Sequence, residues 1–93
     1  MNREILATPK FLRDSRRWAK SHPQTAADVQ TALAGLAADA FDPVLRAHKL
    51  KGGMSGYWAC SAGYDIRIVF EFVPCNGAEA IQLVTMGTHD EVY

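Results

Sequence analysis

The sequence has few of the features that mark a membrane, secreted or metal-binding protein. No apolar run approaches the roughly 20 residues that span a bilayer, and the polar Met-Asn-Arg-Glu start lacks the basic and then apolar plan of a signal peptide. We therefore expect a cytoplasmic protein without membrane contact. Two cysteines and three histidines are too few and too scattered for a disulfide framework or a compact zinc site. We expect reduced thiols at Cys60 and Cys75, no metal and, without a Gly-rich phosphate loop, no cofactor.

The net charge of zero hides an uneven distribution of charge along the chain. Every Lys and Arg lies at or before Arg67, and the segment after it contains four acidic residues and no Lys or Arg. The basic residues crowd two segments, Lys10, Arg13, Arg16, Arg17 and Lys20 in the first and Arg46, Lys49 and Lys51 in the second. Clustered cations form either a solvated face or a footprint for phosphate backbones. Both interpretations stay open for the first segment.

The first half of the chain predicts a pair of antiparallel helices within one domain that spans residues 1–93. Glu4–Ala7 is a plausible short strand, and Thr8 followed by Pro9 is a helix start. His22-Pro23 ends this basic, amphipathic helix and begins a second one that reaches about Ala38. The expected buried stripe of the second helix is Val29, Leu33, Leu36, Ala37 and Ala40.

The second half predicts short strands separated by glycines. We expect an edge segment over Val44–Leu50, a strand over Tyr57–Ala62, an alternating strand over Asp65–Val73 and a closing strand that includes Ile81–Met86. In the alternating strand, Ile66, Ile68, Phe70 and Phe72 point to the core, and Asp65, Arg67, Val69 and Glu71 point away from it. Asn76-Gly77 favours a tight hairpin turn. The sum is an α+β fold with two N-terminal antiparallel helices packed on a small antiparallel β-sheet.

Four residues with acid–base or cationic side chains come from successive β elements: His48, Asp65, Arg67 and His89. Residues near matching ends of adjacent strands converge, because neighbouring strands lie about 4.8 Å apart. Two imidazoles can transfer protons in both directions, and a guanidinium stabilises a phosphorane. This set suits transesterification of RNA without a metal. Each residue also has a structural interpretation, such as a surface position for His48 or a cross-strand ion pair for Arg67.

The same residues resemble a known family. His48-Lys-Leu-Lys-Gly52, Gly56-Tyr57-Trp58, Tyr64-Asp-Ile-Arg-Ile-Val-Phe70 and Gly87-Thr-His89 with an aromatic four residues later are similar to the RelE/ParE toxin superfamily, and more narrowly to its YafQ-type branch. The resemblance implies a ribosome-dependent endoribonuclease that cleaves mRNA, inhibits translation and is silenced by a cognate antitoxin. It also implies that the toxin–antitoxin complex can bind operator DNA through the antitoxin.

Carried over to this sequence, the resemblance places His48 and His89 in proton transfer, Asp65 in the active site, Arg67 near the scissile phosphate and Tyr93 as the closing aromatic. We expect RNA contacts from Arg13, Arg17, Arg46, Lys49 and Lys51. Where YafQ-type toxins have a further histidine on the strand before the aspartate, this chain has Ser61.

Two other functions fit the same fold. One is a ParE-like inhibitor of DNA gyrase without nuclease activity. The other is a catalytically weak homologue that acts as an antitoxin-binding module through its helices. Shared fold cannot choose among them, because function resides in the site.

Overall fold

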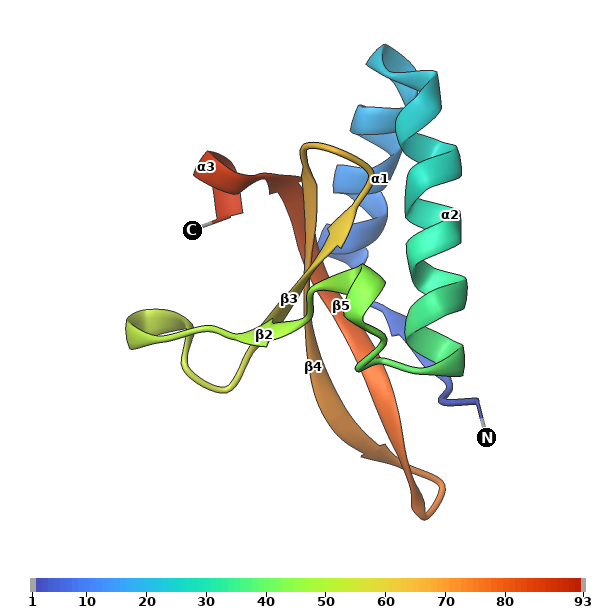
Figure 1. Cartoon of the computed structure of the whole chain (residues 1–93), viewed down its shortest axis with the longest axis vertical. Helices are drawn as coiled ribbons and strands as arrows, with labels where there is room; N and C mark the ends of the chain where they lie inside the picture. The colour runs from blue at the N-terminus through green and yellow to red at the C-terminus, as the bar shows by residue number, and fades with distance from the viewer. Residues whose placement is uncertain (1, 93) are drawn as a thin grey trace.

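The computed structural model describes residues 2–92, in which a helical half precedes a β half (Figure 1). In chain order the elements are β1 (Ile5–Ala7), α1 (Pro9–Ser21), α2 (Pro23–Ala38), the 3₁₀ turn η1 (Pro43–Leu45), β2 (His48–Lys49), the 3₁₀ turn η2 (Gly52–Met54), β3 (Trp58–Ala62), β4 (Ile66–Cys75), β5 (Ala78–Thr88) and α3 (His89–Val92). None of the helices formed by residues 2–92 has the length and apolar character needed to span a bilayer.

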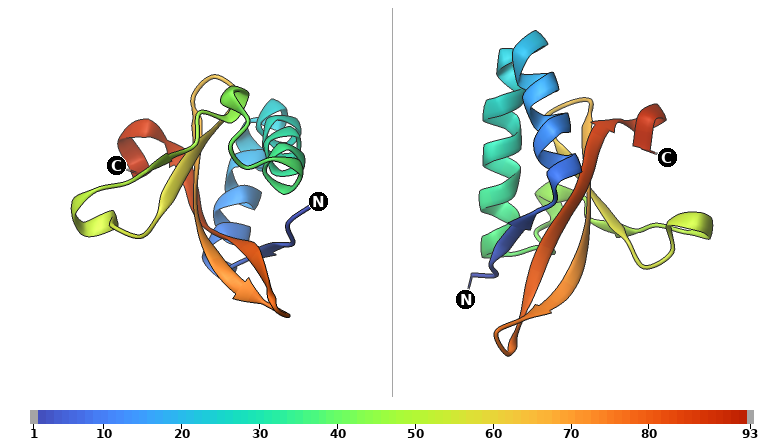
Figure 2. Two further views of the ribbon diagram at one scale, coloured as in Figure 1. Left: turned by 60° about the horizontal axis from the view of Figure 1, so that its bottom comes forward. Right: turned by 180° about the vertical axis from the view of Figure 1, so that it is seen from behind.

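The two long helices begin where the sequence predicts. The Thr8 hydroxyl accepts a hydrogen bond of 3.2 Å from the Phe11 N–H and caps α1, whose first residue is Pro9. His22 closes α1, and Pro23 starts α2 immediately afterwards. Both helices cover the same side of the sheet, while α3 and η2 project on the other side (Figure 2). The predicted helix pair is therefore present.

The sheet has the strand order β1-β5-β4-β3-β2. β2 to β5 form the predicted antiparallel meander, and Asn76 and Gly77 take positive φ angles of 52° and 78° in the hairpin turn. The prediction of a purely antiparallel sheet is wrong, because β1 pairs with β5 in parallel. The Thr8 N–H donates to the Leu83 carbonyl of β5 at 3.1 Å, which continues this pairing up to the start of α1.

Two other predictions for the β half need correction. The Asp42 side chain accepts a 3.0 Å hydrogen bond from the Val44 N–H and starts η1, so the expected edge strand shortens to His48–Lys49. Val69, expected on the outward face of β4, is fully buried. A β-bulge between Val69 and Phe70 shifts the pairing with β5, and bulges increase the local twist of a strand. Val69 is buried but lies outside the core cluster that contains Ile68 and Phe70, so the outward face of β4 is covered at this position.

The core lies between the helix pair and the sheet. Its largest fully buried side chains include Phe70, Leu36, Ile68, Ile81 and Leu83. In α2 the buried positions are Thr25, Val29, Ala32 and Leu36, at helical spacing, and Ala40 is buried just after the helix. Ala37, expected in this stripe, is only half-buried, and Ala32 takes its place in the core.

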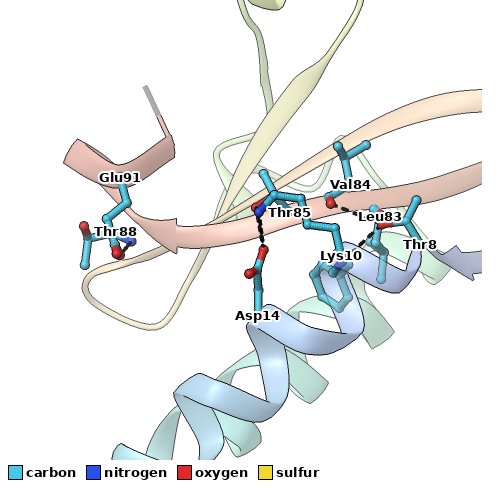
Figure 3. Close-up of polar contacts among 9 residues, drawn as sticks. Thr8, Lys10, Asp14, Leu83, Val84, Thr85, Thr88 and Glu91 are labelled. Carbon is cyan, nitrogen blue, oxygen red and sulfur yellow. Dashed lines mark hydrogen bonds and ion pairs between the residues drawn. The ribbon is translucent and has the colours of Figure 1, made fainter.

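A polar cluster links α1 to the C-terminal half of β5 (Figure 3). The Thr85 hydroxyl donates to Asp14 Oδ2 at 2.7 Å, and Lys10 Nζ lies 2.9 Å from the same oxygen. Burial acts to raise the pKa of Asp14, but these hydrogen bonds and the charges of Lys10 and Arg17 outweigh it and hold the pKa below its usual value. The ionised carboxylate therefore fixes α1 against the strand that leads to α3.

Both cysteines are free thiols, as the sequence predicts. Burial raises the pKa of Cys60 in β3 to about 12, although the charge of Arg67 acts in the opposite direction. The Cys75 thiol donates to a carboxylate oxygen of Glu4 at 3.0 Å, and this bond, together with burial and the Glu4 charge, raises its pKa. Since the thiolate is the reactive form, neither residue is activated as a nucleophile.

Candidate active site

His48 and His89 line one cleft of about 440 Å³, which we call the histidine cleft. The two residues come from different elements, since His48 starts β2 and His89 starts α3 at the end of β5. The other lining residues are Lys49, Leu50, Lys51 and Met54. Two imidazoles and two lysines thus face a common space on the side of the sheet away from the long helices.

The backbone before β2 orients the His48 ring. Arg46 ends η1 with φ 53° and ψ 39°. This is the left-handed region, which residues other than glycine rarely adopt. The Arg46 carbonyl oxygen lies 3.0 Å from His48 Nδ1. A carbonyl can only accept, so Nδ1 donates, and Nε2 is the basic nitrogen of the neutral ring. The geometry therefore selects the tautomer of the neutral His48 ring that carries its proton on Nδ1.

The chain after β5 contains a capping box that holds His89. Thr88 precedes α3, and its N–H donates to Glu91 Oε1 at 2.9 Å (Figure 3). This is the Thr-x-x-Glu arrangement that stabilises helix N-termini. His89 occupies the first position of the short helix, between the two capping residues. Its Nδ1 lies 3.5 Å from Asp90 Oδ1, and both side chains are well exposed, so this contact is weak.

Gly87 provides the space for this arrangement. A Cβ at position 87 would lie 3.0 Å from Glu91 Oε1, 3.2 Å from Glu91 Cβ and 3.4 Å from Val92 Cγ1. The φ angle of Gly87 is not in the left-handed region, so the requirement is for room and not for backbone freedom. The absence of a side chain at Gly87 lets α3 fold back closely against the end of β5.

Asp65 and Arg67 lie in a second cavity of about 540 Å³, which we call the arginine hollow. Its lining residues are Val44, Arg46, Ser61, Gly63, Tyr64, Asp65 and Arg67. Arg67 Nη1 donates to the Ile66 carbonyl at 3.1 Å, which restrains the guanidinium. The two cavities share no lining residue, but neighbouring residues link them. The Arg46 carbonyl lies 3.0 Å from His48 Nδ1, and Arg67 pairs with Gly87, two residues before His89.

A family model described as the bacterial toxin of type II toxin–antitoxin systems, YafQ, matches residues 3–93. The chain belongs to the YafQ toxin family. YafQ from E. coli has the same fold, with a TM-score of 0.77, 15% identity and 98% of both chains covered. The YoeB/ParE toxin from Agrobacterium tumefaciens gives a TM-score of 0.77 at 16% identity, covering 92% of this chain and 98% of that one. No curated protein sequence matches the chain.

YafQ has also been solved with a partner. The E. coli DinJ–YafQ complex matches with a TM-score of 0.77 and 17% identity, and 98% of each chain is covered. At these identities the similarity of the solved structures establishes the fold alone, and the family model establishes the family.

The remaining predicted site residues of this YafQ-family toxin are dispersed. Lys51 lines the histidine cleft, whereas Lys49 also places Nζ 5.7 Å from the centre of the Trp58 ring. Arg13 and Arg17 belong to α1, on the other side of the sheet from α3 (Figure 2). The structure does not bring these two arginines to either cavity. Tyr93 lies outside the described residues.

Other features of the toxin's site bear on chemistry. Ser61, at the position where the resemblance places a histidine in YafQ-type toxins, pairs with Arg67 across β3 and β4 and lines the arginine hollow. Within residues 2–92, no group of three or more His, Cys, Asp or Glu side chains is placed to hold a metal ion.

Sequence reasoning missed Glu91 and the main-chain role of Arg46. The Thr88-x-x-Glu91 spacing is a readable signal for the first. No sequence signal identifies the role of the Arg46 main chain, because arginine is not a residue that predicts a left-handed backbone conformation.

Proposed function

We propose that this YafQ-family toxin is an endoribonuclease that cleaves mRNA on the ribosome and thereby inhibits translation and arrests growth. The observation that carries the proposal is the placement of His48 and His89 in one cleft, on separate elements that can face opposite sides of a phosphodiester. Two acid–base groups on either side of a reacting phosphate suffice for metal-independent transesterification.

In this mechanism His48 is the general base. Nε2 accepts the proton of the 2′-hydroxyl, and the 2′-oxygen forms a bond to phosphorus. His89 donates a proton to the 5′-oxygen as the bond between that oxygen and phosphorus breaks, leaving a 2′,3′-cyclic phosphate and a 5′-hydroxyl. Lys51 in the histidine cleft supplies positive charge to the phosphorane. Each proton-transfer group contributes a rate factor of roughly 10²–10⁴.

Asp65 and Arg67 support the reaction from the adjoining hollow. The Arg67 guanidinium is restrained by its hydrogen bond to the Ile66 carbonyl, and Arg67 itself pairs with Gly87 of β5. It suits recognition of phosphate oxygens near the scissile bond. Asp65 contributes the active-site carboxylate that the family resemblance implies.

The partners follow from the family. E. coli YafQ is solved with DinJ and the Staphylococcus aureus toxin YoeB with YefM, and we infer that a cognate antitoxin likewise silences this protein in the cytoplasm. The complex would reach operator DNA through the antitoxin. The free toxin acts on mRNA and the ribosome.

The experiment is induction of the parent and of His48→Ala, His89→Ala and Asp65→Asn variants, followed by growth curves and primer extension on mRNA. The control is His22→Ala, whose ring contacts Trp18 at the interhelical turn. We expect each histidine substitution at the cleft to lower cleavage by roughly 10²–10⁴-fold and His22→Ala to retain it. Growth arrest by His89→Ala and Asp65→Asn equal to the parent would refute the mechanism.

The same experiment separates the alternatives. Gyrase-dependent DNA damage with intact mRNA would assign the protein to ParE-like inhibition. Full tolerance of growth to induction would favour an antitoxin-binding module.

A further inference from the structure

The arginine hollow contains an aromatic side chain with no structural role in the free protein. Tyr64, in the turn between β3 and β4, is 98% exposed. Val44, which lines the same hollow, is 82% exposed. Large apolar groups held in water at one cavity point to a ligand that covers them.

The backbone holds the Tyr64 turn in place. Gly63 has a φ angle of 67°, and a Cβ there would collide with the Asp28 carboxylate of α2. The turn therefore packs closely on α2 just before Tyr64. A ring presented by a restrained turn loses little freedom when a ligand stacks on it.

The charges of the hollow favour an anion. Arg46 and Arg67 contribute two guanidiniums against the single carboxylate of Asp65. A guanidinium has five N–H donors arranged to bind phosphate oxygens in pairs, and the bond from Arg67 to the Ile66 carbonyl uses one of them. Exposed aromatic rings beside such cations are the usual platforms for unstacked bases of single-stranded RNA.

The volume and position of the hollow point to a single nucleotide. Cavities of about 300–1,000 Å³ suit ligands of small-molecule size, and this one measures about 540 Å³. Arg46 lines the hollow, and its carbonyl also accepts from the His48 ring. Arg67, which also lines the hollow, pairs with Gly87, two residues before His89. An mRNA strand that places one phosphate in the histidine cleft can therefore continue into the hollow.

We propose that the arginine hollow is a subsite for the mRNA nucleotide next to the cleavage site, with its phosphate between Arg46 and Arg67 and its base stacked on Tyr64. The inference rests on the proposed function and deepens it by assigning where the substrate strand lies. Tyr64 is thus a substrate-binding residue that acts outside proton transfer.

The test measures binding of the toxin to ribosomes programmed with an mRNA whose decoding-site nucleotides carry 2′-O-methyl groups, so that no cleavage occurs. Base–aromatic stacking lost on alanine substitution corresponds to about 5- to 150-fold in affinity. We expect Tyr64→Ala to weaken binding by this factor and Tyr64→Phe to bind like the parent. Leu12→Ala, which removes a 41% exposed apolar side chain from α1, serves as the control.

Two parallel arms identify the partner. On ribosomes without mRNA, Tyr64→Ala should bind as the parent does. An equal loss there would assign the ring to ribosomal RNA and overturn the proposal. Binding of the antitoxin should also be unchanged, and a loss confined to the antitoxin would assign the hollow to that protein.

Failure of the subsite differs from failure of the proposed function. If the parent cleaves ordinary mRNA but Tyr64→Ala binds the 2′-O-methyl mRNA as tightly as the parent, the subsite is wrong and the nuclease stands. If the parent binds the modified mRNA through Tyr64 but cleaves no mRNA, the subsite stands and the nuclease function is wrong.

Discussion

Replacing Glu91 by alanine should impair the catalysis that we propose for His89 without unfolding the protein. The Glu91 carboxylate accepts the Thr88 N–H at 2.9 Å, and α3 spans only His89–Val92, so this bond is a large share of what orders the helix. Capping interactions contribute about 0.5–2 kcal/mol. The population in which His89 is correctly placed should therefore fall by up to about 2- to 30-fold, at roughly 1.4 kcal/mol per factor of ten.

Glu91→Gln is the matched variant, because the amide oxygen can accept the same hydrogen bond. Single-turnover cleavage on programmed ribosomes should show a lower kcat for Glu91→Ala, an unchanged KM and near-parental values for Glu91→Gln. Amide exchange at Thr88 should accelerate in the alanine variant alone. Parental cleavage by Glu91→Ala, or equal losses in both variants, would contradict a positioning role through the capping box.

Two further predictions concern stability and thiol reactivity. Asp14→Asn should lower the free energy of unfolding at pH 7. This difference between the variant and the parent should vanish as the pH falls from about 4 through the lowered pKa of Asp14, because a carboxylate with a depressed folded-state pKa stabilises the protein only while it is ionised. Urea unfolding between pH 7 and pH 2.5 measures this, and a difference that persists at the lowest pH would disprove it. Cys60 in the folded protein should resist iodoacetamide at pH 8, since its pKa is about 12. Cys75 should react more slowly in the parent than in the Glu4→Gln variant, because its hydrogen bond to Glu4 raises its pKa. Mass spectrometry of each cysteine peptide tests both predictions, and rapid labelling of Cys60 in the folded protein would count against its burial.

Features encoded by adjacent residues were predictable from the sequence. Thr8-Pro9 and His22-Pro23 mark helix boundaries through side-chain capping and a fixed φ, and Asn76-Gly77 selects its turn through left-handed backbone angles. These signals need no knowledge of the rest of the fold.

Features that depend on distant packing were not predictable. The parallel direction of β1 depends on its pairing with β5, more than 70 residues away, and Val69 is buried although it lies outside the core cluster that contains Ile68 and Phe70. In the site, the positions of His48 and His89 on successive β elements indicated a common location. The support of His48 by the Arg46 carbonyl depends on a backbone angle that side-chain identity does not reveal.

Because β1 pairs with β5, the first strand of the sheet cannot join it until the fifth strand has been synthesised. Residues 78–88 provide the surface to which β1 and α1 attach, and they are synthesised after every other strand of the sheet. A nascent chain that still lacks them cannot complete its sheet, and His89 follows even later. Because His89 directly follows β5, the histidine cleft can assemble only after all five strands of the sheet have been made.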